Sequence, residues 1–247
     1  MDPAYYVAAG SLKARSFQLD VVSNNLANSA TPGYKSERSF FSVFNKARSE
    51  GRGLPLSGDV NDGTVLASRG TDFSQGTLKP TGRNMDLALD GAGFFAIRAQ
   101  GRTLVTRDGR LTMSRTGELQ TLDGATVLGK NGQPIVLDPA DPSFTVLPDG
   151  TVQQGADPRG QLDIKDYQDT GALQRVGSNR FDPGTAAPKA ASAQVIQGSQ
   201  EQSSVDMATC MIDMIRLNRL FEMSLKAAST ITNDLDAKSI SDVATGK

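Results

Sequence analysis

The residues of this chain that match a chemical motif do so in the wrong structural context. Gly91, Gly93 and Ala96 have the spacing G-x-G-x-x-A of a dinucleotide-binding turn. That motif needs a helix directly after the glycines to hold a pyrophosphate. The residues that follow, FFAIR, are typical of a strand. We therefore interpret residues 91–96 as a turn that leads into a strand, and we expect no bound nucleotide.

Carboxylates are the other candidates for chemistry. The run DVNDG at residues 59–63 has the residue types of a calcium loop. The alternation of an EF-hand loop is broken, however, and its closing glutamate is missing. Asp86 with Asp90, or Asp163 with Asp166, could form an acid–base pair. Carboxylates on a β-rich surface are more often solvated charges. No metal or other cofactor is expected.

Composition also argues against an enzyme. The 247 residues include no histidine, so the usual general base and the commonest metal ligand are missing. A carboxylate-dependent hydrolase remains a formal alternative. The single cysteine, Cys210, excludes an internal disulfide, and we expect a buried thiol.

Charge and hydropathy exclude further classes of protein. With a net charge of −1, the chain has no basic surface for nucleic acid or anionic lipid. No apolar run approaches the length of about 20 residues that a membrane helix needs. The first residues, MDPAYYVAAGSLKARSF, lack a basic leader and a continuous apolar stretch. We expect no cleavable secretory signal.

Both ends of the chain carry apolar heptads without internal helix breakers. Apart from Pro3, which a helix tolerates in its first turn, every proline lies between Pro32 and Pro188. We expect helices over about 3–30 and 200–238, and each apolar stripe should pack against a partner helix. The stripes are Tyr5, Leu12, Leu19, Val22 and Leu26 in the first helix, and Met207, Met211, Met214, Phe221 and Leu225 in the second.

The middle of the chain has the pattern of an antiparallel β-domain. Residues 84–182 are short apolar runs separated by Asp-Gly and Asn-Gly dipeptides at spacings of about 8–12 residues. The predicted fold class is α+β, with long N- and C-terminal helices pairing as a coiled coil around an inserted antiparallel β-rich domain. The predicted domains are 1–35 with 190–247 for the helices, an extended connector over 36–83, and the β-rich domain over 84–189.

Seven short motifs resemble those of the bacterial flagellar rod and hook proteins, and they occur in the order found in that family. They are NNLAN (24–28), TPGYK (31–35), DGAGFF (90–95), TRDG (106–109), VLG (127–129), NRLFE (218–222) and KA (226–227). The set spans almost the whole chain. The motif residues that we single out are Asp90, Gly91, Gly93, Phe94, Phe95, Arg107, Asp108, Gly109, Arg219 and Glu222.

The resemblance implies a structural axial component of the flagellar basal body, located in the periplasmic rod. It further implies export in an unfolded state by the flagellar type III export apparatus. In such proteins the terminal helices form the inner layer of a tube and the β-rich middle forms the outer layer. The implied partners are further copies of the chain and other rod proteins. The expected partner-binding residues are those of the two stripes together with Asn25 and Asn28, whose amides could either cap the first helix or bond to neighbouring subunits.

Several alternatives stay open. The short rod proteins of the family lack a sizeable middle domain, and hook proteins are usually longer. The opening Met1-Asp2 and the absence of tryptophan resemble the proximal rod type more than the distal rod type. Leu220 departs from the family, which often has alanine there. An alternative from another class is an adhesin or fibre subunit with a coiled-coil stalk, although such a stalk would normally be one continuous segment.

Overall fold

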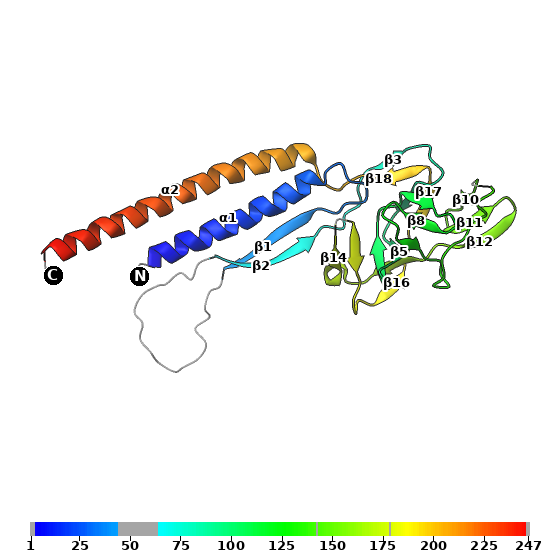
Figure 1. Ribbon diagram of the computed structural model, residues 1–247, viewed down its shortest axis with the longest axis horizontal. Helices are drawn as coiled ribbons and strands as arrows, with labels where there is room; N and C mark the ends of the chain where they lie inside the picture. Colours follow the sequence, from blue (N-terminus) through cyan, green and yellow to red (C-terminus); the bar gives the residue numbers. More distant parts are fainter. Residues whose placement is uncertain (1–2, 44–63, 142, 178, 246–247) are drawn as a thin grey trace. The chain divides into compact units, whose positions relative to one another are not determined.

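The structure is a computed structural model, and it describes residues 3–43, 64–141, 143–177 and 179–245 (Figure 1). The chain divides into two compact units. The helical unit comprises residues 1–26, 37–70 and 207–247, and the β unit comprises residues 27–36 and 71–206. Residues 44–63, which include the calcium-like run and part of the predicted connector, lie outside the described residues.

The helical unit contains two long helices and a two-stranded sheet. Helix α1 spans Pro3–Ala27 and helix α2 spans Met207–Thr245. Strands β1 (Glu37–Val43) and β2 (Thr64–Thr71) form the sheet. Pro3 occupies the first turn of α1, where its missing N–H has no partner to lose. Within the described residues, neither helix is long and apolar enough to cross a membrane.

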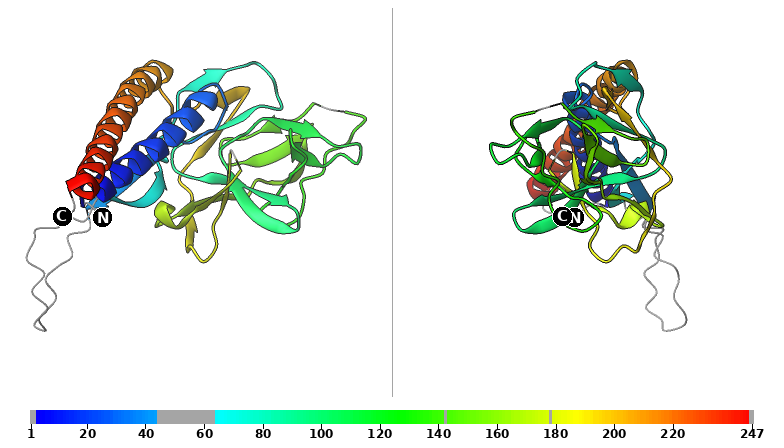
Figure 2. Two further views of the ribbon diagram at one scale, coloured as in Figure 1. Left: turned by 60° about the vertical axis from the view of Figure 1, so that its left-hand side comes forward. Right: turned by 90° about the vertical axis from the view of Figure 1, so that its right-hand side faces the viewer.

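The predicted fold class is wrong, because no coiled-coil pair of terminal helices forms within the described residues 3–27 and 207–245. Figures 1 and 2 show that α1 and α2 do not wind around each other. Met207, Met211 and Leu225, which belong to the predicted stripe of α2, are 45%, 46% and 46% exposed. The fold instead has two helices and a β-rich remainder of several antiparallel sheets.

The physical reason lies in which side of each helix is sheltered. In α2 the less exposed positions follow steps of four and three through Cys210, Met214, Leu217, Phe221, Ser224 and Ala228. That side mixes large and small residues. The heptad prediction included its Met214 and Phe221 but joined them to Met207, Met211 and Leu225, which are exposed. In α1 the predicted stripe has little more than one large residue per heptad. Such a stripe drifts by about 20° per heptad on a straight helix, so it makes no continuous seam.

The β unit consists of short strands. They are β3 (Leu78–Pro80), β4 (Leu87–Asp90), β5 (Phe94–Ala99), β6 (Arg102–Thr106), β7 (Leu111–Met113), β8 (Leu119–Thr121), β9 (Thr126–Val127), β10 (Thr145–Val146), β11 (Thr151–Gln154), β12 (Asp157–Gln161), β13 (Ile164–Tyr167), β14 (Gln174–Val176), β15 (Arg180–Asp182), β16 (Pro188–Ala190), β17 (Gln194–Gln197) and β18 (Ser199–Glu201), with a 3-10 turn at Thr170–Ala172. The largest sheet runs in the order β14-β15-β6-β5-β9-β8-β7, and β13 pairs with β5 on one side and with β16 on the other. The pairings among the described strands of the β unit are antiparallel.

Strand β5 supplies both cores of the β unit. Successive side chains of a strand point to opposite faces, so Phe94 and Phe95 enter different clusters. Phe95 belongs to the larger, mainly aliphatic core, and Phe94 belongs to a smaller core with Tyr167 and Phe181. The rings of Phe73 and Phe181 pack edge to face, with their centres 4.9 Å apart. Burial of each large side chain contributes about 1.5–3 kcal/mol.

The last strands of the β unit pair with its first ones. β17 pairs with β4, and β18 pairs with β3, with Glu201 opposite Leu78 (Figure 1). The second helix begins at Met207, not near residue 200 as predicted. Glu201 is therefore not a charge at a helix N-terminus but the buried last residue of a strand.

Candidate functional site

A buried group of three charged side chains lies in the β unit, and we call Lys35, Arg107 and Glu201 the Glu201 cluster. The carboxylate of Glu201 is 0% exposed. Its Oε1 accepts hydrogen bonds from Lys35 Nζ at 2.6 Å and from the backbone N–H of Gly76 at 2.9 Å. Its Oε2 accepts a hydrogen bond from Arg107 Nη1 at 3.2 Å. Three segments that are distant in sequence thus meet at one carboxylate.

The cations of the cluster have further acceptors. Lys35 Nζ donates to the carbonyl of Ser74 at 2.7 Å. Arg107 Nη2 donates to the carbonyl of Gly91 at 2.8 Å, and its guanidinium lies 5.2 Å from the centre of the Phe94 ring. The motifs TPGYK, DGAGFF and TRDG are therefore held together by the side chains of Lys35 and Arg107.

Backbone hydrogen bonds join the same two ends of the β unit. The N–H of Gly33 donates to the carbonyl of Glu201 at 2.8 Å, and the N–H of Ser204 donates to the carbonyl of Tyr34 at 3.0 Å. Gly33 has φ +70°, and a Cβ atom there would lie 2.6 Å from the backbone nitrogen of Asp108. The geometry of this turn therefore depends on glycine at position 33.

A second set of polar contacts holds the TPGYK segment from the other side. Asn179 donates from Nδ2 to the carbonyl of Pro32 at 3.0 Å and to Asp108 Oδ2 at 3.2 Å. Asp108 also accepts from Arg110 Nη2 at 2.6 Å. The guanidinium of Arg175 lies over the Tyr34 ring, 4.8 Å from its centre. Residues 31–35 are thus fixed by contacts to three later segments.

The electrostatics of the Glu201 cluster are those of a structural site. Burial lowers the pKa of Lys35, and the charge of Arg107 adds to this effect, while Glu201 opposes it. Burial also lowers the pKa of Arg107, again against the attraction of Glu201. Two buried cations share one buried anion, so the loss of the anion would leave two uncompensated charges.

The helical unit has its own buried polar contact at the end of α1. Asn25 Nδ2 donates to the carbonyl of Glu37 at 2.8 Å, and the N–H of Glu37 donates back to Asn25 Oδ1 at 2.8 Å. Cys210, which is buried as expected, lies with its Sγ 3.4 Å from the carbonyl of Val22. A groove of about 570 Å³ is lined by α1, β1 and α2.

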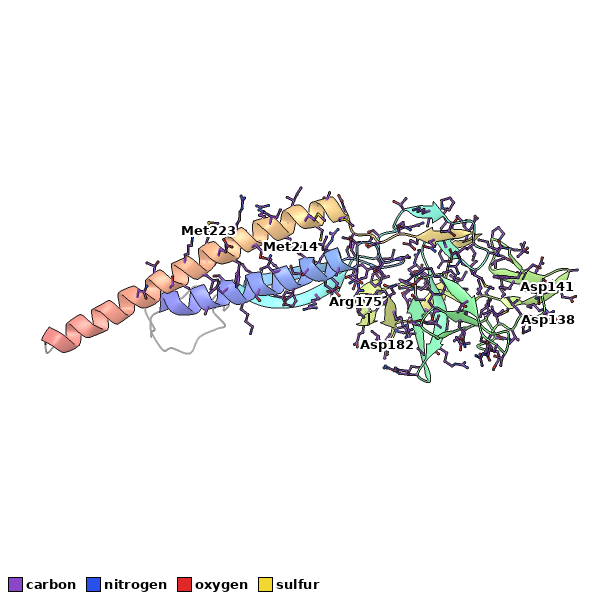
Figure 3. All side chains as sticks on the ribbon, turned by 45° about the horizontal axis from the view of Figure 1, so that its top comes forward. Asp138, Asp141, Arg175, Asp182, Met214 and Met223 are labelled. Atoms are coloured by element: carbon purple, nitrogen blue, oxygen red, sulfur yellow. The ribbon has the colours of Figure 1, made fainter. Side chains whose placement is uncertain are left out.

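The structure places the predicted partner-binding residues at three levels of exposure. On α2, the predicted residue Met214 is half-buried, whereas the nearby Met223 is exposed; both are labelled in Figure 3. Met207, Met211 and Leu225 are exposed; Leu12, Leu19, Val22, Leu26, Asn28, Met214 and Phe221 are half-buried; Asn25 is buried; Tyr5 lies in α1, with its side chain outside the described part. Their role in binding partners stays a prediction.

The motif residues separate between the two units. Gly93, Phe94, Phe95, Arg107 and Gly109 are buried, Gly91 and Asp108 are half-buried, and Asp90 is exposed, all in the β unit; Arg219 and Glu222 are exposed on α2. Sequence reasoning missed Glu201, Arg175 and Asn179. No local signal marks them, because Glu201 and Lys35 are 166 residues apart.

Comparisons with known proteins match the chain in three regions. Residues 6–35 match the family described as "Flagella basal body rod protein". Residues 88–154 match "Flagellar hook protein FlgE/F/G D1 domain", and residues 196–240 match "Flagellar basal body rod FlgEFG protein C-terminal". Each region supplies one charged residue of the Glu201 cluster: Lys35, Arg107 and Glu201 respectively.

Curated relatives cover nearly the whole chain. The chain is 33% identical to the flagellar basal-body rod protein FlgF of Caulobacter vibrioides, over 92% of both chains. It is 29% identical to FlgG of the same bacterium, over 96% of this chain and 98% of the relative. It is 30% identical to FlgG of Borreliella burgdorferi, over 94% of this chain and 96% of the relative. These matches confirm the resemblance, and the chain belongs to the family of flagellar basal-body rod proteins.

Proposed function

We propose that the chain is a rod subunit of the FlgF type that binds its neighbours through the exposed apolar surface of α2. Membership of the family makes it a structural component of the flagellar basal body, where it assembles with other rod proteins. A structural family of this kind gives no reason to expect an enzyme. The assignment to the proximal rod rests on the higher identity to FlgF than to FlgG within one bacterium, Caulobacter vibrioides.

The exposed apolar surface of α2 is the observation that carries this proposal. Within the described residues, α2 exposes Met207, Met211, Ile212, Ile215, Met223 and Leu225, each by at least 45%. Exposed apolar side chains that lie close together mark surfaces that bind other proteins. Methionine adapts to irregular neighbours, which suits a helix that meets several slightly different subunits.

The proposal includes two further expectations that come from the family. Export would proceed through the flagellar type III apparatus without removal of an N-terminal segment. The final location would be the periplasmic part of the rod.

Substitution of Met211 tests the role of α2. Met211 is 46% exposed, so Met211→Asp should leave the fold of the chain intact. A charge on an apolar binding surface should prevent incorporation into purified basal bodies, because it would be desolvated without a partner. Met211→Leu is the matched control and should incorporate normally. Normal incorporation of Met211→Asp would show that this part of α2 is not an interface.

The position of the subunit in the rod is tested separately. Gold-labelled antibody against residues 84–182 should bind the lower rod of basal bodies if the chain is of the FlgF type. Label on the upper rod would assign it to the FlgG type. Absence of label where the rod is accessible would contradict a rod location altogether.

A further inference from the structure

We infer that Glu201 acts as a closing residue for the β unit: without it, Lys35 and Arg107 cannot be buried, and the unit stays open. The β unit then folds only when its last segment, residues 199–204, is in place, so this segment does more than add one stabilising strand. The inference itself rests on the geometry of the β unit. Its use in export, given below, rests on the proposed function.

The topology makes the early strands depend on the late ones. β3 and β4 are the first strands of the β unit, and their partners β18 and β17 are the last. The N–H groups of Gly33 and Thr81 also donate to late carbonyls, those of Glu201 and Gly198. Pairing across more than one hundred residues requires closure of a long loop, which is slow and costs chain entropy before any contact forms.

The buried charges make folding without the late strands energetically unfavourable. In the closed unit the side chains of Lys35 and Arg107 are 1% and 4% exposed. Both contact the carboxylate of Glu201, which is itself fully buried. If residues 31–36 and 107 packed in place before Glu201 arrived, two like charges would be buried together without an anion. A buried charge without a partner is far more costly than a missing stabilising contact.

No other carboxylate of the described residues can replace Glu201 in this role. Asp72 and Asp166 act on the two cations at longer range. Asp72 Oδ1 accepts a hydrogen bond from the N–H of Ser74, and Asp166 Oδ2 pairs with Lys189 Nζ at 3.0 Å. Both carboxylates therefore have their own donors, and neither forms an ion pair with Lys35 or Arg107.

Such a closing residue suits a chain that is exported in an unfolded state, as the proposed function expects. Residues 27–198 would carry all but the last strand of the β unit, yet they would remain open. The unit would close only when Glu201 has followed. Premature closure, which would obstruct a narrow channel, is thereby disfavoured by a single charge.

The decisive experiment compares Glu201→Gln, Lys35→Met and the double variant in the full-length monomer. Hydrogen exchange of β5 and β6 amides reports the folding equilibrium of the β unit. Glu201→Gln should lower that equilibrium constant by about a hundredfold or more, because it leaves two unpaired cations. Asp157→Asn, at an exposed carboxylate of the same unit, should change it little.

The double variant separates a closing residue from an ordinary stabilising contact. If unpaired charge is the obstacle, adding Lys35→Met to Glu201→Gln should restore at least about tenfold in the equilibrium constant. If the folding equilibrium constant of the double variant is no higher than that of Glu201→Gln, the inference is overturned. The same holds if both variants are unfolded. Faster exchange confined to residues 27–36 in Glu201→Gln, with β5 and β6 still protected, overturns it as well.

Refolding of the unaltered full chain tests the order of events. In pulse-labelled hydrogen exchange, amides of β5 and β6 should gain protection together with residues 199–204. Protection of β5 and β6 in an earlier phase would contradict the inference. The Met211→Asp chain should refold in the same order, because Met211 lies in the helical unit. Loss of rod incorporation therefore tests the proposed function, and a changed order of protection tests the role of Glu201, so the two results can be told apart.

Discussion

The two units of the chain differ in where they place their large apolar side chains. The β unit buries its aromatic residues Phe94, Tyr167 and Phe181 in one cluster and closes it with internal charge pairs. In the helical unit, α2 shelters Cys210, Met214, Leu217 and Phe221 on one side, while it exposes the side chains of Met211, Ile212, Ile215 and Met223. The β unit forms its two apolar cores within itself, whereas the exposed apolar side chains of α2 are the surface proposed above to bind a partner.

The two units also differ in how their charged side chains are paired. In the β unit every charge of the Glu201 cluster has a partner from another segment of the same unit. On α2, Arg219 and Glu222 are exposed, and exposed charges of this kind contribute little to stability. Substitutions of similar chemistry should therefore have very different effects in the two units.

The largest expected difference comes from truncating a large apolar side chain in each unit. Phe181 is 0% exposed and packs edge to face on Phe73. Phe181→Ala should lower the free energy of unfolding of the β unit by about 3–5 kcal/mol, because it leaves a cavity. Leu225 is 46% exposed, and Leu225→Ala should change stability by no more than about 0.5 kcal/mol.

Denaturant unfolding of each variant, followed by the near-UV signal of the tyrosines, measures both effects. If Leu225→Ala nevertheless weakens incorporation into basal bodies, the difference between the two units is supported further. If Leu225→Ala destabilises the monomer as much as Phe181→Ala, the difference is contradicted, since Leu225 would then be packed within its own chain.

A smaller effect is expected from two glycines of the β unit that share a backbone conformation. Gly33 has φ +70° and Gly82 has φ +72°. A Cβ at position 33 would lie 2.6 Å from the backbone nitrogen of Asp108, while a Cβ at position 82 would have no neighbour within 4 Å. Gly82→Ala should cost about 1 kcal/mol through backbone strain alone.

Gly33→Ala adds displacement of the backbone at Asp108 to that strain, so it should cost at least about twice as much. Thermal unfolding of the two variants side by side gives the difference. Equal losses would show that the TPGYK turn tolerates movement away from Asp108, and that the Glu201 cluster does not need it held in place.

Local features of the β unit could be predicted from the sequence, whereas the Glu201 cluster could not. The Asp-Gly pair at 123–124 predicts a tight turn, and Gly124 indeed has φ +82° between β8 and β9. Such signals depend on neighbouring residues. Glu201 instead receives its donors from residues 35, 76 and 107, and nothing in the sequence around it reveals them.

The helices show a different limit of sequence reasoning. Their existence follows from proline-free ends with apolar periodicity, but the sheltered side of α2 does not. The heptad pattern groups Met207 and Met211 with Met214 and Phe221, yet only the latter two lie on the less exposed side of α2. That side also includes Ser224 and Ala228, which a pattern of large apolar residues does not identify. Periodicity identifies apolar stripes without showing which partner each stripe meets.

The most local expected effect concerns two polar residues of α1. Asn25 is 8% exposed and exchanges two hydrogen bonds of 2.8 Å with the backbone of Glu37, whereas Ser23 is exposed. Asn25→Ala should destabilise the start of β1 by about 1–3 kcal/mol, because the N–H and carbonyl of Glu37 lose their partner. Ser23→Ala should be neutral or slightly stabilising, since alanine favours helix.

Hydrogen exchange of the Glu37 amide measures this difference directly. It should accelerate in Asn25→Ala and stay unchanged in Ser23→Ala, and both variants should leave the amides of β5 as protected as before. If Ser23→Ala instead blocks rod incorporation while Asn25→Ala does not, the two residues have different roles: Asn25 stabilises its own chain, and Ser23 belongs to the surface that neighbouring subunits bind. Equal acceleration in both variants would mean that the end of α1 frays as a whole, and the helical unit would then have no fixed polar contact comparable to those of the β unit.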